Sequence, residues 1–250
     1  MMVGAAAQLG KGQRPQMRDL LLNPRNVTRV ADELAKMRGA AMKIGQLMSM
    51  DTGDMFPPEV TQIMARLRAD AHFMPPAQLK KVLSENWHPA WLRDFKRFDV
   101  RPIAAASIGQ VHRAQTNDGR DMAIKVQYPG VAKSIDSDVA NVGALIKMAG
   151  ILPKGFEYKP YMAEAAAQLH EETNYTLEST HLTSFTELLA NDDRFQIPKL
   201  FTDWTTTQIL AMSYVDGIAI EDTADFPQDQ RNKIATDLVD LMLAELFTFK

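Results

Sequence analysis

A change in hydrophobic periodicity near Phe98 sets the main constraint on how this chain can fold. Before that point, apolar residues recur at alternating spacings of three and four, which is typical of one apolar stripe along an α-helix. The stripe consists of Val27, Val30, Leu34, Met37, Ala41, Ile44 and Met48. After that point, short segments alternate apolar and polar residues, as strands do. The sequence therefore predicts a helical first third joined to a small antiparallel sheet.

Proline and turn residues predict the boundaries of further elements. Helices are expected after Pro57-Pro58 and from about Pro75 to Trp87, because proline suits the first turn of a helix. Asn117-Asp118-Gly119 suits a tight hairpin between two strands. The remaining predicted elements are helices at 131–148 and 161–189, strands at 196–202 and 207–212, and a helix from Pro227 to the last residue.

The order of these elements predicts an α+β fold of the protein-kinase N-lobe type, with about five antiparallel strands, one long helix and an N-terminal helical extension. We expect a flexible arm at 1–25, the extension at 26–97, the N-lobe with its hinge at 98–217, and the start of a C-lobe at 218–250. The last helix still presents an apolar face at Lys250. A C-lobe that is largely missing is therefore expected.

Composition narrows the functional classes. A net charge of −3 and a pI near 6.0 give no global basic field, so nucleic-acid binding is not expected. The absence of cysteine excludes disulfides and thiolate metal sites, and no metal site is expected from the sequence. No run approaches the ~18 apolar residues of a membrane span, and a cytoplasmic location is expected. Residues 1–50 carry eight Lys or Arg against three Asp or Glu, which favours either an anionic membrane surface or an ordinary solvated helix face.

An alanine-rich segment matches the spacing of a kinase Gly-x-Gly-x-x-Gly-x-Val loop, with alanine at the first two glycines. Glycine lets backbone N–H groups approach phosphate oxygens, whereas each alanine methyl narrows the accessible backbone angles. The segment is thus either a modified phosphate-binding loop or the packed end of a strand. Its candidate positions are Ala104, Ala105, Ala106, Ser107, Gly109 and Val111.

The next strand, 122–127, carries a lysine at a position suited to phosphate binding. Strand alternation directs Ala123 and Lys125 to one face, and Ile124 and Val126 to the other. Beside a nucleotide, the small Ala123 leaves room for adenine while the Lys125 ammonium reaches the α- and β-phosphates. The alternative is a lysine that projects into water.

Such a lysine requires a carboxylate, and the helix predicted at 161–189 supplies Glu171, Glu172 and Glu178. On one continuous helix Glu172 and Glu178 lie about 120° apart, so two different partners are implied. Lys43 and Gln46 share a face of the first helix and offer a candidate second partner. The alternative for each glutamate is an ordinary solvated position.

The predicted strand at 207–212 leads into a segment that resembles the hinge between kinase lobes. It includes Met212, and it breaks at Gly217. Backbone groups of Ser213 and Val215 are candidates to bind adenine, and Asp216 is a candidate to reach the ribose. Any strand that ends in a turn would give the same pattern.

From about Val27 to Lys250 the chain resembles the UbiB family, also called the aarF-domain or ADCK atypical kinase-like proteins. The most specific match is Lys43-Ile44-Gly45-Gln46, which fits the Lys-x-Gly-Gln motif of that family's helical extension. The resemblance implies that Lys125 binds phosphates and pairs with Glu178. It also implies that Glu172 pairs with Lys43 and packs the extension across the mouth of the site, so that Lys43, Gln46, Glu172, Glu178 and Lys125 are the candidate catalytic residues.

The resemblance further implies ATP and Mg²⁺ as cofactors and a role in ubiquinone biosynthesis. Asn174 stands where the family commonly has aspartate, so a charge is lost there. The sequence contains no His-x-x-Asp catalytic loop and no Asp-Phe-Gly. The metal ligands are therefore expected downstream of Lys250. If the protein ends there, we expect a weak nucleotide binder or an inactive fragment; if the chain is part of a longer protein, we expect that protein to bind ATP with Mg²⁺.

Three functions remain open on the sequence. The first is an atypical kinase or ATPase of the UbiB family. The second is a pseudokinase-like scaffold that binds membrane lipid, a quinone precursor or quinone-biosynthesis proteins without chemistry. The third is an ordinary kinase, which leaves Lys43-Ile44-Gly45-Gln46 unexplained.

Overall fold

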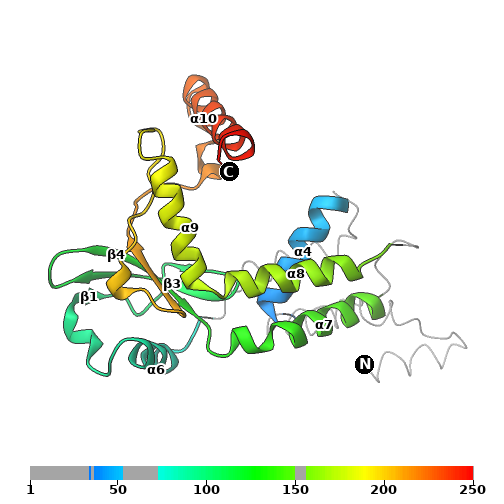
Figure 1. Cartoon of the computed structure of the whole chain (residues 1–250), viewed down its shortest axis with the longest axis horizontal. Coiled ribbons are helices and arrows are strands. Elements are labelled where there is room, and N and C mark those ends of the chain that lie inside the picture. The colour runs from blue at the N-terminus through cyan, green and yellow to red at the C-terminus, as the bar shows by residue number, and fades with distance from the viewer. Residues whose placement is uncertain (1–33, 35–36, 53–72, 150–155, 250) are drawn as a thin grey trace, which may run out of the picture.

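The computed structural model describes residues 34, 37–52, 73–149 and 156–249. Within them, an antiparallel sheet is joined at one end to a layer of helices (Figure 1). The arm expected at 1–25 and the helix expected after Pro57-Pro58 lie outside the described residues. No helix among the described residues is long and apolar enough to span a lipid bilayer.

The sheet has five antiparallel strands, as the sequence predicts. Its order is β1-β3-β4-β5, and β2 also pairs with β3. The turn between β3 and β4 is the expected hairpin, and Gly119 within it adopts a positive φ of 93°, which glycine allows without strain. The strands are β1 (Phe95–Phe98), β2 (Ala104–Ala105), β3 (Gly109–Thr116), β4 (Asp121–Gln127) and β5 (Ile209–Ser213).

Helices α4 and α6 precede the sheet in the sequence, α7, α8 and α9 lie between β4 and β5, and α10 follows β5. In Figure 1, α4, α7 and α8 lie together beyond one end of the sheet, α9 lies along the sheet, and α10 stands apart from the helical layer. Their bounds are α4 (Arg38–Thr52), α6 (Pro76–Asn86), α7 (Val131–Ala149), α8 (Lys159–Glu172), α9 (Tyr175–Leu188) and α10 (Gln228–Phe247). Short 3-10 helices occupy Trp91–Asp94, Thr202–Trp204 and Ile220–Thr223.

The single long helix predicted at 161–189 is wrong, because the chain forms two helices that break at Thr173 and Asn174. Asn174 is the N-cap of α9, and its side chain accepts a hydrogen bond from the N–H of Leu177 at 3.2 Å. The buried side chain of Gln127 donates to the carbonyl of Thr173 at 2.7 Å and so satisfies the backbone at the break. A break of two residues barely disturbs the hydrophobic spacing, which is why the periodicity did not reveal it.

The strand predicted at 196–202 is also wrong. Only an isolated bridge between Leu200 and Met212 forms there. Pro198 lies in the middle of this segment and has no N–H to donate to a sheet. The last helix was predicted to run from Pro227 to the last residue, but α10 ends at Phe247.

Two apolar cores lie on opposite faces of the sheet. One joins the sheet to the helical layer, where Ile108, Leu210 and Tyr175 pack against α4, α7 and α8. The other lies between the sheet and α6, and it contains all three tryptophans of the chain, Trp87, Trp91 and Trp204. Their rings contact one another and Phe95 at centroid distances of 4.8–5.9 Å.

A chain of buried polar groups runs through the second core. The Met74 N–H donates to Gln110 Oε1 at 2.7 Å, Gln110 Nε2 contacts His112 Nε2 at 2.8 Å, and His112 Nδ1 contacts the Asp99 carbonyl at 2.8 Å. Because a carbonyl can only accept, His112 carries its proton on Nδ1, and its Nε2 accepts from Gln110. Burial lowers the pKa of His112.

Candidate nucleotide-binding site

The site is built on the sheet face that carries Lys125. On β4, residues 122, 124 and 126 are buried and 123 and 125 are partly exposed, which confirms the predicted alternation. Lys125 is flanked by Val111 on β3 and Leu210 on β5, and Ala123 is flanked by Met212 on β5. Paired residues on antiparallel strands project to the same face, so these five side chains share one surface.

Lys125 is held by a carboxylate from α9. Its Nζ lies 2.7 Å from Oε1 and 2.9 Å from Oε2 of Glu178, so both carboxylate oxygens accept from one ammonium. The same ammonium lies 4.9 Å from the centre of the buried Tyr175 ring. The Lys125 side chain is 21% exposed, so the pair is partly shielded from water but still accessible. The pairing expected from the resemblance is therefore present, and the role of Lys125 in phosphate binding stays a prediction.

A second ion pair joins α8 to the helical extension. Lys43 on α4 pairs with Glu172, the last residue of α8. The other oxygen of Glu172 accepts a hydrogen bond from Ser107 Oγ at 2.9 Å. One carboxylate thus connects the extension, α8 and the loop between β2 and β3.

Glu172 and Glu178 do not lie on one continuous helix, as the sequence predicted, because the break at Thr173 and Asn174 separates them. Each glutamate does pair with a different lysine, but the reason is that α8 and α9 position them independently.

The alanine-rich segment forms a tight turn between β2 and β3. The Ala106 N–H donates to the Gly109 carbonyl at 2.8 Å, and Ala104 pairs with Val111 across the two strands. A Cβ on Gly109 would lie 2.4 Å from the Val126 carbonyl oxygen. Glycine is therefore required there for close packing of β3 on β4, a reason that the sequence analysis did not give.

The helical extension packs directly on this turn. A Cβ on Gly39 of α4 would lie 3.2 Å from Cγ2 of Ile108 and 3.4 Å from the Ser107 carbonyl oxygen. The turn is also tied to the end of β4, because the Tyr128 N–H donates to the Ile108 carbonyl at 2.9 Å. The 106–109 turn is consequently held by α4 on one side and by the end of β4 on the other.

The segment predicted to be a hinge follows β5 directly. The Ser213 N–H donates to the Lys199 carbonyl at 2.8 Å, so this donor is already engaged. The N–H of Val215 makes no backbone hydrogen bond with the residues that the structure describes. Asp216 is exposed, and its Oδ1 accepts from the Gly217 N–H at 3.1 Å.

A pocket of about 480 Å³ lies between the two ion pairs. Two lysines and three glutamates line it, so a bound anion would meet more negative than positive charge. Its lining consists of Lys43, Ser107, Lys125, Gln168, Glu171, Glu172, Leu177, Glu178 and His181. Gln46 is exposed on α4 and does not line this pocket.

Sequence reasoning missed three contacts in the site. These are the Ser107 bond to Glu172, the Tyr175 ring beside Lys125, and the Gln127 bond to Thr173. A polar residue at the end of an otherwise apolar strand was the one available signal for Gln127. The other two contacts depend on how α8 and α9 meet the sheet, which local spacing does not determine.

The fold and the site define a protein-kinase-like N-lobe with a helical extension packed against its loop. Residues 66–250 match the family model described as the ABC1 atypical kinase-like domain. The chain therefore belongs to the ABC1 atypical kinase-like family, which is the UbiB family that the sequence resembles.

Curated relatives agree with this assignment. The atypical kinase COQ8, mitochondrial, of Saccharomyces cerevisiae is 37% identical over 244 residues, which cover 98% of this chain and 49% of the relative. The atypical kinase COQ8, mitochondrial, of Schizosaccharomyces pombe is 40% identical over 228 residues, which cover 91% of this chain and 37% of the relative. The chain thus spans half or less of the length of these relatives.

A solved structure supports the fold alone. It is titled the complex structure of Rv3197-erythromycin from Mycobacterium tuberculosis, and it aligns with a TM-score of 0.53 at 24% identity. The alignment covers 94% of this chain and 57% of that chain.

Proposed function

We propose that this chain is the ATP-binding lobe of an atypical kinase or ATPase that supports ubiquinone biosynthesis. The observation that carries the proposal is the Lys125 ammonium held by both oxygens of Glu178. A paired lysine on the middle strand, next to a tight turn and a small alanine, provides the charge and the space that a nucleotide requires. The link to ubiquinone rests on the family resemblance.

In this proposal each part of the surface has one task. Lys125 binds the α- and β-phosphates, and the 106–109 turn covers them. Adenine lies against Val111, Ala123 and Met212. The carbonyl of Ser213 and the N–H of Val215 bind its edge, and Asp216 reaches the ribose.

The charge of the pocket favours a metal complex of the nucleotide. Three glutamates outnumber two lysines around the space in which the phosphates would lie. A free triphosphate would be repelled by these carboxylates, whereas Mg²⁺ bound to the phosphates offsets their negative charge. The residues present therefore fit Mg-ATP better than ATP alone.

Isothermal titration of the chain with Mg-ATP, together with thermal unfolding, tests the proposal. Bound ligand raises the unfolding temperature, and does so more strongly the tighter it binds, so wild type should be stabilised. Lys125→Met keeps most of the side-chain volume but removes the charge, and it should weaken binding by about tenfold or more. Lys133→Met, at an exposed position of α7, is the matched control and should bind like wild type.

Two results would contradict the proposal. One is no binding of Mg-ATP by wild type, which would favour the non-catalytic scaffold. The other is equal binding by wild type and Lys125→Met. Free ATP without Mg²⁺ should bind more weakly than Mg-ATP, and the reverse order would contradict the charge argument.

We also propose that the basic excess of residues 1–50 brings the protein to the periphery of an anionic membrane. Flotation with vesicles of anionic and of neutral lipid tests this. The chain should float with anionic vesicles, and flotation should weaken when residues 1–31, which carry five of the eight basic residues and one of the three acidic ones, are deleted. Equal flotation of both forms would remove the membrane proposal.

A further inference from the structure

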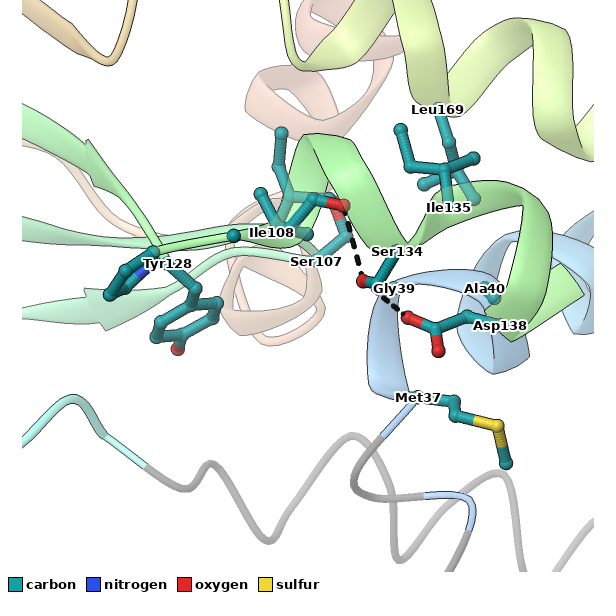
Figure 2. A pocket seen from close by; sticks show the side chains of 13 residues that line it. Met37, Gly39, Ala40, Ser107, Ile108, Tyr128, Ser134, Ile135, Asp138 and Leu169 are labelled. Carbon is teal, nitrogen blue, oxygen red and sulfur yellow. Dashed lines mark hydrogen bonds between the residues drawn. The ribbon is translucent and has the colours of Figure 1, made fainter.

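A second pocket, of about 380 Å³, lies on the other side of the 106–109 turn. It is formed where the start of α4, the start of α7 and the turn meet, and Figure 2 shows its lining. Ser107 is the one lining residue that it shares with the pocket beside Lys125. The two spaces are therefore separate sites on either side of one turn.

The walls of this pocket are mainly apolar. Ile108, Ile135 and Leu169 are 1–2% exposed, so they form the packed base of the pocket and offer a ligand little surface. Met37 and Val131 add further apolar surface. A volume of this size with apolar walls suits a small organic molecule.

One carboxylate supplies the charge of the pocket. Among the thirteen described residues that line it, Asp138 is the one charged residue, and none of them is a lysine, arginine or histidine. Its Oδ2 accepts a hydrogen bond from Ser134 Oγ at 2.8 Å, and Ser134 Oγ lies 3.2 Å from the Val131 carbonyl. Figure 2 shows the carboxylate beside Ser134, with the Met37 side chain nearby.

The second oxygen of Asp138 is available to a ligand. No described residue donates a hydrogen bond to Oδ1 or forms an ion pair with this carboxylate. A partly exposed carboxylate attracts a cation and repels an anion. The pocket is thus selective by charge as well as by size.

We propose that this pocket binds a small apolar molecule that carries an ammonium group, which Asp138 receives. The apolar part of the ligand lies against Met37, Tyr128 and Val131, which line the pocket and are partly exposed. A carboxylate or phosphate in the same position is disfavoured. The inference does not depend on nucleotide binding at Lys125.

Three probes of equal shape test the proposal by titration calorimetry with the full chain. They are para-butylbenzylamine, the neutral para-butylbenzyl alcohol and the anionic para-butylbenzoate. Wild type should bind the amine about tenfold more tightly than the alcohol, and the benzoate most weakly. Asp138→Asn should lose this preference and bind the amine about tenfold more weakly, with the alcohol unchanged.

Asp136→Asn is the matched control. It removes the same charge from the same helix at an exposed position that does not line the pocket, so it should bind all three probes like wild type. Asp138→Asn retains an oxygen that accepts from Ser134, so its unfolding midpoint should stay close to that of wild type. Equal binding of the amine by wild type and Asp138→Asn would overturn the proposal, as would tighter binding of the benzoate or no binding of any probe.

Discussion

At the scale of single residues, His112 is where pH should act on this fold. It is fully buried, and its Nε2 must stay unprotonated to accept from Gln110. Burial lowers its pKa below the ordinary value of about 6.5, so the folded state resists a proton that the unfolded state accepts. Its contribution to stability is complete above about pH 6.5 and is lost as the pH falls from there through the folded pKa.

Urea unfolding at a series of pH values between 5 and 8 measures this effect. The free energy of unfolding should fall below about pH 6.5 with a slope of up to about 1.4 kcal/mol per pH unit from this residue. His112→Gln should lower stability at every pH and flatten this part of the slope. His181→Gln, at an exposed position of α9, should leave the slope as it is, and a flat wild-type profile would contradict the argument.

Close packing at Gly109 and at Gly39 can be tested by replacing each glycine with alanine. In Gly109→Ala the new methyl would lie 2.4 Å from a backbone carbonyl, so β3 and β4 must separate. We expect a loss of about 1–3 kcal/mol or more in the free energy of unfolding. In Gly39→Ala the nearest atom is a side-chain methyl at 3.2 Å, and alanine also favours the helix by about 0.5–1 kcal/mol.

The Gly39 variant should therefore stay within about 1 kcal/mol of wild type. Chemical unfolding of both variants checks this difference. A Gly109→Ala protein as stable as Gly39→Ala would show that the sheet can accommodate the methyl.

The sequence predicted some residue contacts better than others. The pairs Lys125 with Glu178 and Lys43 with Glu172 followed from the family resemblance, and both are present. Residue spacing alone indicated only that two partners exist. The bond from Ser107 to Glu172 joins residues 65 positions apart, and its formation depends on how α8 meets the turn.

At the scale of elements, the break between α8 and α9 depends on Asn174. Its side chain caps α9, and asparagine and aspartate are about equally good at this position. Asn174→Ala should lower the free energy of unfolding by about 0.5–2 kcal/mol, whereas Asn174→Asp should be close to wild type. Urea unfolding of the two variants checks this, and an aspartate variant as unstable as the alanine variant would argue against a capping role.

The sequence predicted correctly whether a segment forms a helix or a strand where one face of that segment is buried. The alternation in β4 and the helix at Val131–Ala149 agree with the prediction because each buries a regular pattern of apolar residues. The break at Asn174 was missed because a capping residue in mid-pattern resembles an ordinary solvent-facing position. The strand predicted at 196–202 does not form, because Pro198 interrupts the local alternation and has no N–H to donate to a sheet.

At the scale of the whole molecule, polar contacts connect the helical layer to the sheet side of the described structure. One is Gln127, which is 2% exposed and donates to the Thr173 carbonyl. All three tryptophans lie on the sheet face away from the helical layer, so their fluorescence reports on that half, while far-UV circular dichroism reports mainly on the helices. If the core around Ile108 and Tyr175 makes one cooperative unit, both signals should change at the same urea concentration.

Gln127→Leu removes the donor and leaves a partly buried carbonyl without it, so the unfolding free energy should fall by about 1–3 kcal/mol with the two signals still coincident. Gln196→Leu, at an exposed position, is the control and should have little effect. Separate midpoints in wild type would show that the two halves unfold independently.

The class of fold was predictable from the order of elements, and five antiparallel strands with a helical extension confirm it. Which helices cover which face was not predictable, because the two cores both consist of ordinary apolar residues. The roles of the individual site residues stay predictions until ligands are tested.

The number of residues between Glu172 and Glu178 limits which insertions and deletions this chain can accept during evolution. The two carboxylates end one helix and begin the next, and each is committed to a lysine on a different element. One residue gained or lost in between would turn α9 by about 100° about its axis and remove Glu178 from Lys125, even if no side chain in the site were replaced. Substitutions at Thr173 are therefore tolerable in principle, whereas insertions and deletions at the same place should be eliminated by selection.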